Sequence, residues 1–152
     1  MTPLAGLEAS AFGQAVRDWF PLVKAVHLAG IALLIGTIAV VDLRLLGLLR
    51  DRSVRTLATR LLPWTAGSFL LIVPSGLAMF VGYASELIAS QVFVLKICLI
   101  LCAGANAAVF HAGAFRSAAS WDAGVAPPAA ARTAGAVSLA LWASVITCGL
   151  SL

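Results

Sequence analysis

Four long apolar runs constrain the fold of this chain more than any other feature of its sequence. They span approximately residues 20–47, 63–83, 91–114 and 131–151. A helix needs about 20 mostly apolar residues to cross the bilayer core. Within that core only helices and closed barrels satisfy every backbone polar group. Each run therefore predicts one membrane-spanning helix.

The composition leaves little room for anything outside the membrane. Of the 152 residues, 62% are hydrophobic and 11% are charged, whereas soluble domains are roughly 45–50% apolar and about 25% charged. The connections between the runs are short, which favours an up-down bundle. We therefore expect residues 1–152 to form a single all-α domain, an integral membrane four-helix bundle whose main partner is the lipid bilayer.

Two further segments have the pattern of helices that lie at a membrane interface. Residues 4–19 place apolar side chains at helical spacing between polar ones, which predicts a short amphipathic helix. Residues 51–62 set apolar positions against arginines, including Arg55 and Arg60, which predicts a cationic interfacial helix between spans one and two on an anionic leaflet. Pro74 in the middle of span two predicts a kink.

The basic residues indicate topology rather than nucleic-acid binding. The net charge is +4, but half of the lysines and arginines fall between the end of the first run and the start of the second. These are Arg44, Arg50, Arg52, Arg55 and Arg60. Arg116 and Arg132 bracket the third loop. The positive-inside rule places both loops in the cytoplasm and both termini outside.

Ionisable residues within spans are costly and mark functional sites by default. A rise of 1.5 Å per residue sorts them by depth. The outer layer contains Lys24, His27, Met79, Lys96, Cys98 and Cys148, and the inner layer contains Asp42, Arg44, Trp64 and His111. The two histidines should differ in height by roughly half of the ~30 Å core. One haem shared by His27 and His111 therefore needs a bent span or a shifted boundary, and it remains an alternative.

His27 has the stronger local case for binding a cofactor. Lys24 lies one turn outward and can extend its amine to the interface, while Gly30 lies one turn inward and removes bulk beside the imidazole. A flat macrocycle could approach there. The alternative is that Gly30 serves helix packing and that His27 bonds to a backbone carbonyl or a serine across the bundle.

The remaining polar residues of the spans have simpler candidate roles. Asp42, on a facing helix, could orient His111 and raise its basicity, as carboxylates do for metal-bound histidines. Asp42 could equally pair with Arg44 or Arg50 at the headgroup level. Asn106 must find a hydrogen-bonding partner on a neighbouring helix.

Copper is a second candidate ligand. His27, Met79, Cys98 and Cys148 carry donor atoms that suit Cu(I). No two of these four share a span, and Met and Cys in apolar helices usually fill the core. A copper-handling protein and a cofactor-free structural or assembly subunit therefore remain alternatives.

Two stretches of the sequence resemble a known family. The first is F-P-L-V-K-A-V-H-L-A-G with I-G-T-I-A-V-V-D-L-R-L-L-G, within residues 20–47, and the second is L-K-x-x-L-x-x-x-A-G-x-N-A-x-x-F-H, residues 95–111. Together they resemble a family of small bacterial four-helix membrane proteins that has no assigned function. The resemblance covers most of the chain and implies a multi-pass protein of the bacterial inner membrane.

The chain is also distantly similar to two families with known chemistry. The HemJ type of protoporphyrinogen oxidase has K-x-x-H in its first span, a leucine-arginine motif at the end of that span and a lysine at the start of span three. The corresponding residues here are Lys24, His27, Arg44 and Lys96. In that family the first-span histidine is tied to haem binding. The copper resistance protein D family also begins a span with a histidine followed by small residues. Asp42 and the later position of His111 differ from the HemJ pattern, so the oxidase activity itself is not implied.

These observations together predict a membrane electron-transfer protein that binds one haem b, alone or as a subunit of a larger complex. His27 is the expected axial ligand, and Lys24 or Lys96 would meet a propionate. The second ligand is open between His111, Met79 and a residue from another chain. A redox partner protein, a quinone and a second copy of the chain are the candidate partners. No catalytic residue is assigned.

Overall fold

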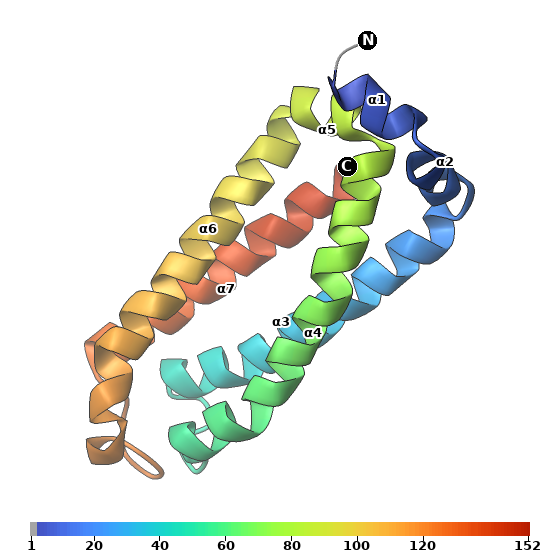
Figure 1. The fold of residues 1–152 in the computed structure, drawn as a ribbon. Helices are drawn as coiled ribbons and strands as arrows, with labels where there is room; N and C mark the ends of the chain where they lie inside the picture. The colour runs from blue at the N-terminus through green and yellow to red at the C-terminus, as the bar shows by residue number, and fades with distance from the viewer. Residues whose placement is uncertain (1–2) are drawn as a thin grey trace.

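The computed structural model describes residues 3–152, and these residues form helices and loops without strands. The elements in order are α1 (Pro3–Ala9), α2 (Ala11–Asp18), α3 (Phe20–Leu46), α4 (Val54–Gly82), α5 (Ala84–Ala89), α6 (Gln91–Ala112), the 3-10 helix η1 (Ala114–Ser120) and α7 (Ala129–Leu150). The helices α3, α4, α6 and α7 are long and apolar enough to cross a membrane. The predicted all-α four-helix membrane bundle is therefore confirmed (Figure 1).

Three of the four spans begin and end close to where the apolar runs placed them. The exception is α4, which begins at Val54 rather than near residue 63. The arginine-rich segment is thus not a separate helix between two spans, because it forms the first turns of α4. Ser53 caps this start by accepting a hydrogen bond from the amide of Thr56, and the helix continues through Pro63 and Pro74.

The predicted amphipathic helix at the N-terminus is divided into α1 and α2. The break is at Ser10, whose hydroxyl oxygen accepts a hydrogen bond from the amide of Gly13 and so caps α2. Arg17 of α2 donates to the carbonyl of Gly82 at 3.0 Å, and Glu8 of α1 accepts from the amide of Ser85 at 2.6 Å. Both short helices are therefore attached to the junction of α4 and α5.

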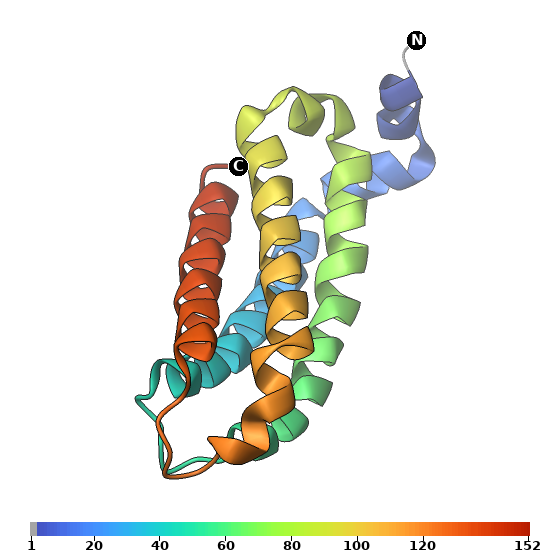
Figure 2. The ribbon, with the colours of Figure 1, turned by 90° about the vertical axis from the view of Figure 1, so that its left-hand side faces the viewer.

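The long helices form two hairpins that meet along one seam. In one hairpin α3 packs against α4, and in the other α6 packs against α7. The seam between the hairpins joins α3 to α7, whereas α4 and α6 do not approach each other closely (Figures 1 and 2). A stacked pair of rings, Phe80 of α4 and Phe93 of α6, bridges the open side with centroids 6.1 Å apart.

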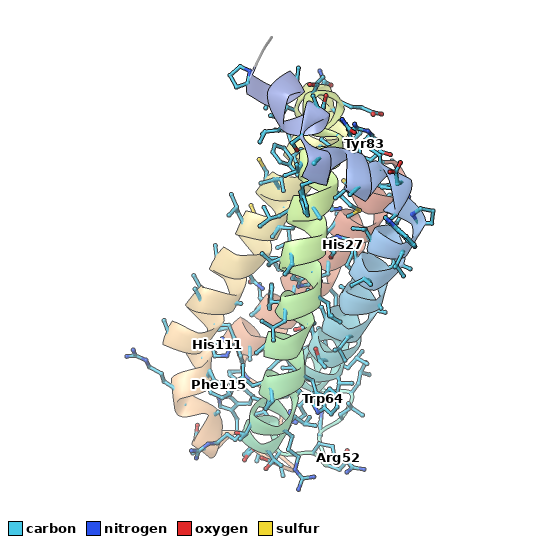
Figure 3. The ribbon with its side chains drawn as sticks, turned by 45° about the vertical axis from the view of Figure 1, so that its right-hand side comes forward. His27, Arg52, Trp64, Tyr83, His111 and Phe115 are labelled. Atoms are coloured by element: carbon cyan, nitrogen blue, oxygen red, sulfur yellow. The ribbon has the colours of Figure 1, made fainter. Side chains whose placement is uncertain are left out.

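The two ends of the bundle differ in charge. The helix α1 and the last turn of α7 lie at one end, here called the terminal end (Figure 1). The opposite end carries Arg44, Arg50, Arg52, Arg55, Arg60, Arg116 and Arg132 and is here called the basic end. Figure 3 shows Tyr83 at the terminal end, and Arg52 and Trp64 toward the basic end. The orientation of these ends in the membrane remains a prediction.

Small residues allow the helices to approach closely. A Cβ atom at Gly135 of α7 would lie 3.0 Å from the Cβ of Leu45 and 3.1 Å from the backbone oxygen of Asp42. The amide of Asn106 donates to the carbonyl of Ala134 at 3.0 Å and joins α6 to α7. The predicted interhelical role of Asn106 is thereby confirmed.

The contact at Gly135 gives a prediction for stability. We expect Gly135→Ala to lower the melting temperature in detergent, because the added methyl group meets the backbone of α3 and overpacking typically costs about 1–3 kcal/mol. The matched control is Gly104→Ala, since nothing lies within 4 Å of a Cβ atom at Gly104. Alanine favours the helix over glycine, so this control should melt at the same temperature or higher. Equal melting temperatures of the two variants would contradict the expected overpacking between α3 and α7.

Candidate functional site

His27 of α3 is held against α4 by one of its two ring nitrogens. The side chain is buried, and Nδ1 lies 3.1 Å from the carbonyl oxygen of Ile72 and 2.9 Å from the hydroxyl oxygen of Ser75. A carbonyl oxygen can only accept, so Nδ1 carries a proton in this arrangement. In the neutral ring Nε2 then has the free lone pair. No described residue is hydrogen-bonded to Nε2.

The imidazole of His27 packs against a turn of α4 that contains Pro74, Ser75 and Gly76. Gly76 leaves space for the ring, because a Cβ atom there would lie 3.1 Å from Cε1 of His27. The Ser75 hydroxyl also lies within hydrogen-bonding distance of the carbonyls of Leu71 and Ile72. Pro74 lacks the N–H that would bond to the carbonyl of Leu70, one residue before the carbonyls that Ser75 contacts. Ser75 and Gly76 therefore fix the position of His27.

The alternative that His27 bonds to a carbonyl or a serine across the bundle is confirmed for Nδ1. The expectation for Gly30 is corrected. A Cβ atom at Gly30 would lie 2.8 Å from Cγ1 of Ile72 and 3.0 Å from the Cβ of Leu71. The space beside Gly30 is therefore filled by α4, and Gly30 serves close helix packing rather than the approach of a macrocycle.

Other members of the predicted outer layer lie near His27. Met79 follows Ser75 by four residues and Gly76 by three, which places it one turn away on the same face of α4. Lys96 of α6 lies within electrostatic range of His27, Lys24 and Cys148. The structure thus brings donor atoms from α3, α4, α6 and α7 toward the same half of the bundle.

The two lysines of this region each have a local contact. The amine of Lys24 lies over the ring of Phe20, 5.7 Å from its centroid. The amine of Lys96 lies 3.4 Å from the Cβ position of Gly149, in the last turn of α7. A cation is favourable at that position because carbonyl groups point out of a helix at its C-terminus. The amine of Lys96 therefore lies beside the end of α7.

The residues expected for copper differ in their burial. Cys148 is buried, whereas Cys98 and Cys102 are exposed. Among residues 3–152, no group of three or more His, Cys, Asp or Glu side chains is arranged to hold a metal ion. The copper hypothesis therefore stays a prediction.

His111 is separated from His27. It is exposed near the end of α6, and its Nδ1 donates to the carbonyl of Ala107 in the same helix at 2.8 Å. Its ring packs against Phe110 and Phe115, with centroids 5.3 Å and 5.1 Å away. Figure 3 shows His27 and His111 in different halves of the bundle. The structure does not bring the two histidines together around one site.

Asp42 does not make either of the pairings expected from the sequence. It is buried at the seam, close to Ser138 of α7, and its Oδ2 has no hydrogen-bond partner among the described residues. Arg50 donates to the carbonyl of Gly47 at 2.9 Å instead. Within the part of the chain that the structure describes, the ion pair is between Arg52 and Asp51 at 3.1 Å.

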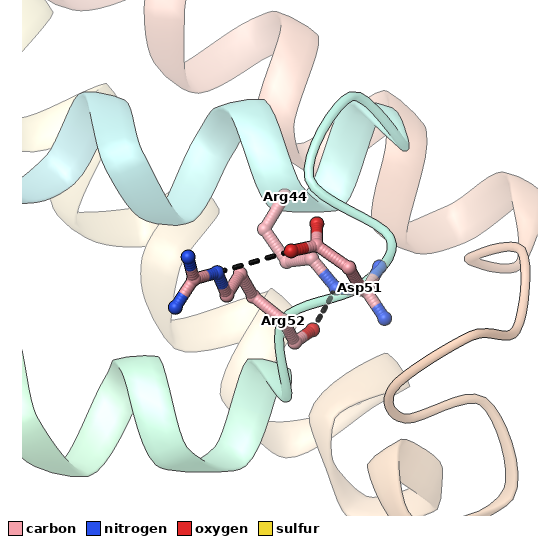
Figure 4. A network of polar contacts seen from close by, with 3 residues as sticks. All are labelled: Arg44, Asp51 and Arg52. Atoms are coloured by element: carbon pink, nitrogen blue, oxygen red, sulfur yellow. Dashed lines mark hydrogen bonds and ion pairs between the residues drawn. The ribbon is translucent and has the colours of Figure 1, made fainter.

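The side chain of Arg44 is fully buried and joins two loops at the basic end. Its Nε donates to the carbonyl of Arg52 at 2.6 Å, as Figure 4 shows beside the exposed ion pair of Arg52 with Asp51. Its Nη2 donates to the carbonyls of Asp122 at 3.0 Å and Trp121 at 3.3 Å. The loop between α3 and α4 is thus tied to the loop before α7.

The side chain of Asp122 completes this arrangement, which we call the Arg44 clamp. One carboxylate oxygen accepts from the hydroxyl of Ser53 at 2.8 Å, and the other accepts from the amide of Val54 at 2.7 Å. A carboxylate at this position satisfies the free N–H groups of a helix start and interacts favourably with the helix dipole. Asp122 therefore caps α4 from a distant loop, a role that sequence reasoning missed because no local spacing connects the two.

The fold defines the class of this chain as a multi-pass membrane protein built on four helices. Comparison with family models, with curated proteins and with solved structures finds no match. The resemblances inferred from the motifs of spans one and three therefore stay predictions.

Proposed function

We propose that this chain is a b-type haem-binding protein of the bacterial inner membrane, with Nε2 of His27 as an axial ligand. The observation that carries the proposal is the contact from Nδ1 of His27 to the carbonyl of Ile72. Metal-bound histidines almost always donate their second ring N–H to a carbonyl or a carboxylate, which fixes the tautomer and makes the ligand more basic. His27 has this arrangement before any metal is considered.

The neighbouring residues fit a haem in their chemistry. The thioether of Met79 would serve as the second axial ligand, since His and Met together hold haem iron in cytochromes c. The amines of Lys24 and Lys96 would meet the propionates, and the amine of Lys96 lies beside the end of α7. Haem, when bound, supplies one-electron transfer. A residue from another chain is the other candidate for the second ligand, since His111 lies in the other half of the bundle.

The same proposal includes a role in membrane electron transfer, alone or within a larger complex. The apolar side chains of the bundle would exclude water and so influence the potential of the group. A quinone or a redox protein would exchange the electron. By the positive-inside rule the basic end would face the cytoplasm, and both termini would face outward.

Absorption spectroscopy tests the proposal directly. Protein made with an ample haem supply is purified, and its spectrum is recorded before and after reduction with dithionite, together with its haem and copper content. We expect a Soret band, a shift on reduction and one haem per chain. Absence of the Soret band would reject the proposal. Stoichiometric copper would favour the copper-handling alternative, and absence of both would favour a structural subunit.

A further inference from the structure

A hollow at the basic end is lined only by hydrogen-bond donors and hydroxyl groups. It has a volume of about 340 Å³ and is lined by Arg55, Thr56, Thr59 and Arg60 of α4.

 The four residues belong to the first turns of α4 and are exposed. Thr59 donates to the carbonyl of Arg55 at 2.9 Å, while the guanidinium groups of Arg55 and Arg60 make no ion pair with a described residue. The hollow therefore presents two unpaired positive charges.

The chemistry of these side chains suits a phosphate group. Guanidinium groups bind phosphate through paired N–H···O bonds in a fixed geometry. The hydroxyl of Thr56 adds a further donor beside them. No carboxylate lines the hollow, so nothing in it opposes an anion.

The part of α4 that follows the hollow has an exposed apolar face, which indicates that the phosphate belongs to a lipid. Residues seven apart lie on nearly the same face of a helix, so Thr56 is followed on that face by Pro63, Leu70 and Leu77. Leu70 is 77% exposed and Leu77 is 61% exposed. The exposed Trp64 marks the headgroup level between the hollow and these leucines. A charged hollow thus continues into an apolar surface that can contact an acyl chain.

We propose that Arg55, Thr56 and Arg60 bind the phosphate of one anionic phospholipid, whose acyl chain lies along the face of α4 that carries Leu70 and Leu77. The cationic first turns of α4 then recognise a lipid molecule at a defined site, in addition to the general attraction of a basic surface to an anionic leaflet. This site lies at the opposite end of the bundle from His27 and does not depend on haem.

Lipid titration followed by native mass spectrometry tests this site. The delipidated full chain in detergent is titrated with phosphatidylglycerol, with phosphatidylcholine and with inorganic phosphate. We expect saturable binding of one phosphatidylglycerol and much weaker binding of the other two. The double variant Arg55→Gln/Arg60→Gln should bind phosphatidylglycerol about thirtyfold more weakly, given the typical contribution of each arginine near an anionic lipid.

The matched control is Arg116→Gln/Arg132→Gln, which removes the same charge from two exposed positions at the same end. It should keep the affinity of the unmodified chain. Equal weakening in both double variants would show diffuse attraction and overturn the site. Inorganic phosphate that binds as tightly as phosphatidylglycerol would show a site for a free anion, and equal binding of phosphatidylcholine would overturn the preference for an anionic lipid. Circular dichroism of each variant checks that the helices are retained.

Discussion

Replacing His27 with alanine is expected to abolish the Soret band of the purified protein. The substitution removes Nε2, which is the proposed bond to iron, and the apolar surroundings offer no equivalent nitrogen. The helix α4 should persist, because the carbonyl of Ile72 and the hydroxyl of Ser75 also have partners within the helix. The measurement is the absorption spectrum and haem content of the variant, compared with the unmodified chain at equal protein concentration.

Two controls make the result specific. His111→Ala should keep the Soret band, because His111 is exposed on another helix and bonds only to its own turn. Imidazole added to His27→Ala should restore part of the band, since the small ligand can occupy the space that the side chain leaves. Haem retained in His27→Ala and lost in His111→Ala would mean that the other histidine is the ligand.

Replacing Arg44 with alanine is expected to destabilise the protein more than any other single arginine substitution. The buried guanidinium donates to three backbone carbonyls in two loops. A hydrogen bond to a charged group is worth about 1.5–3 kcal/mol, and its loss leaves buried acceptors unsatisfied. We therefore expect the free energy of unfolding to fall by about 3 kcal/mol or more. Thermal or denaturant unfolding in detergent measures the change.

Two variants serve as comparisons for Arg44→Ala. Arg116→Ala removes an exposed arginine at the same end and should change the stability by about 0.5 kcal/mol or less. Arg44→Lys keeps the charge but loses the planar fork of donors that reaches both loops, so it should recover only part of the loss. If Arg44→Ala and Arg116→Ala have the same free energy of unfolding, the Arg44 clamp does not stabilise the basic end.

The membrane spans could be predicted from local signals, but the start of α4 could not. The end of α3 follows from Gly47, which adopts a left-handed conformation with φ 90°, and the start of α6 follows from the capping hydroxyl of Ser90. The start of α4 depends on Asp122, which lies 68 residues further along the chain than Val54. Pro63 appeared to be the natural first turn of a span, although the capped helix continues through it.

The depth of each candidate site residue in the membrane could be predicted from the sequence, but the residues that face it on the neighbouring helix could not. Counting residues along the spans separated His27 from His111, and the structure keeps them apart. The partners of His27 depend on how α3 is rotated and shifted against α4, which places Ser75 and Gly76 opposite the ring. The expected pairing of Asp42 with Arg44 is wrong because residues two apart point to different sides of a helix. Asp42 faces α7, whereas Arg44 faces the loops.

The Arg44 clamp also bears on the order in which the chain acquires its structure during synthesis. The hairpin of α3 and α4 emerges from the ribosome before the loop that carries Trp121 and Asp122. Until that loop is made, the guanidinium of Arg44 lacks its partners Trp121 and Asp122, and the amide of Val54 lacks the carboxylate of Asp122. The first hairpin is thus completed only by the second, so we expect both halves to reach their native state together and late in biosynthesis.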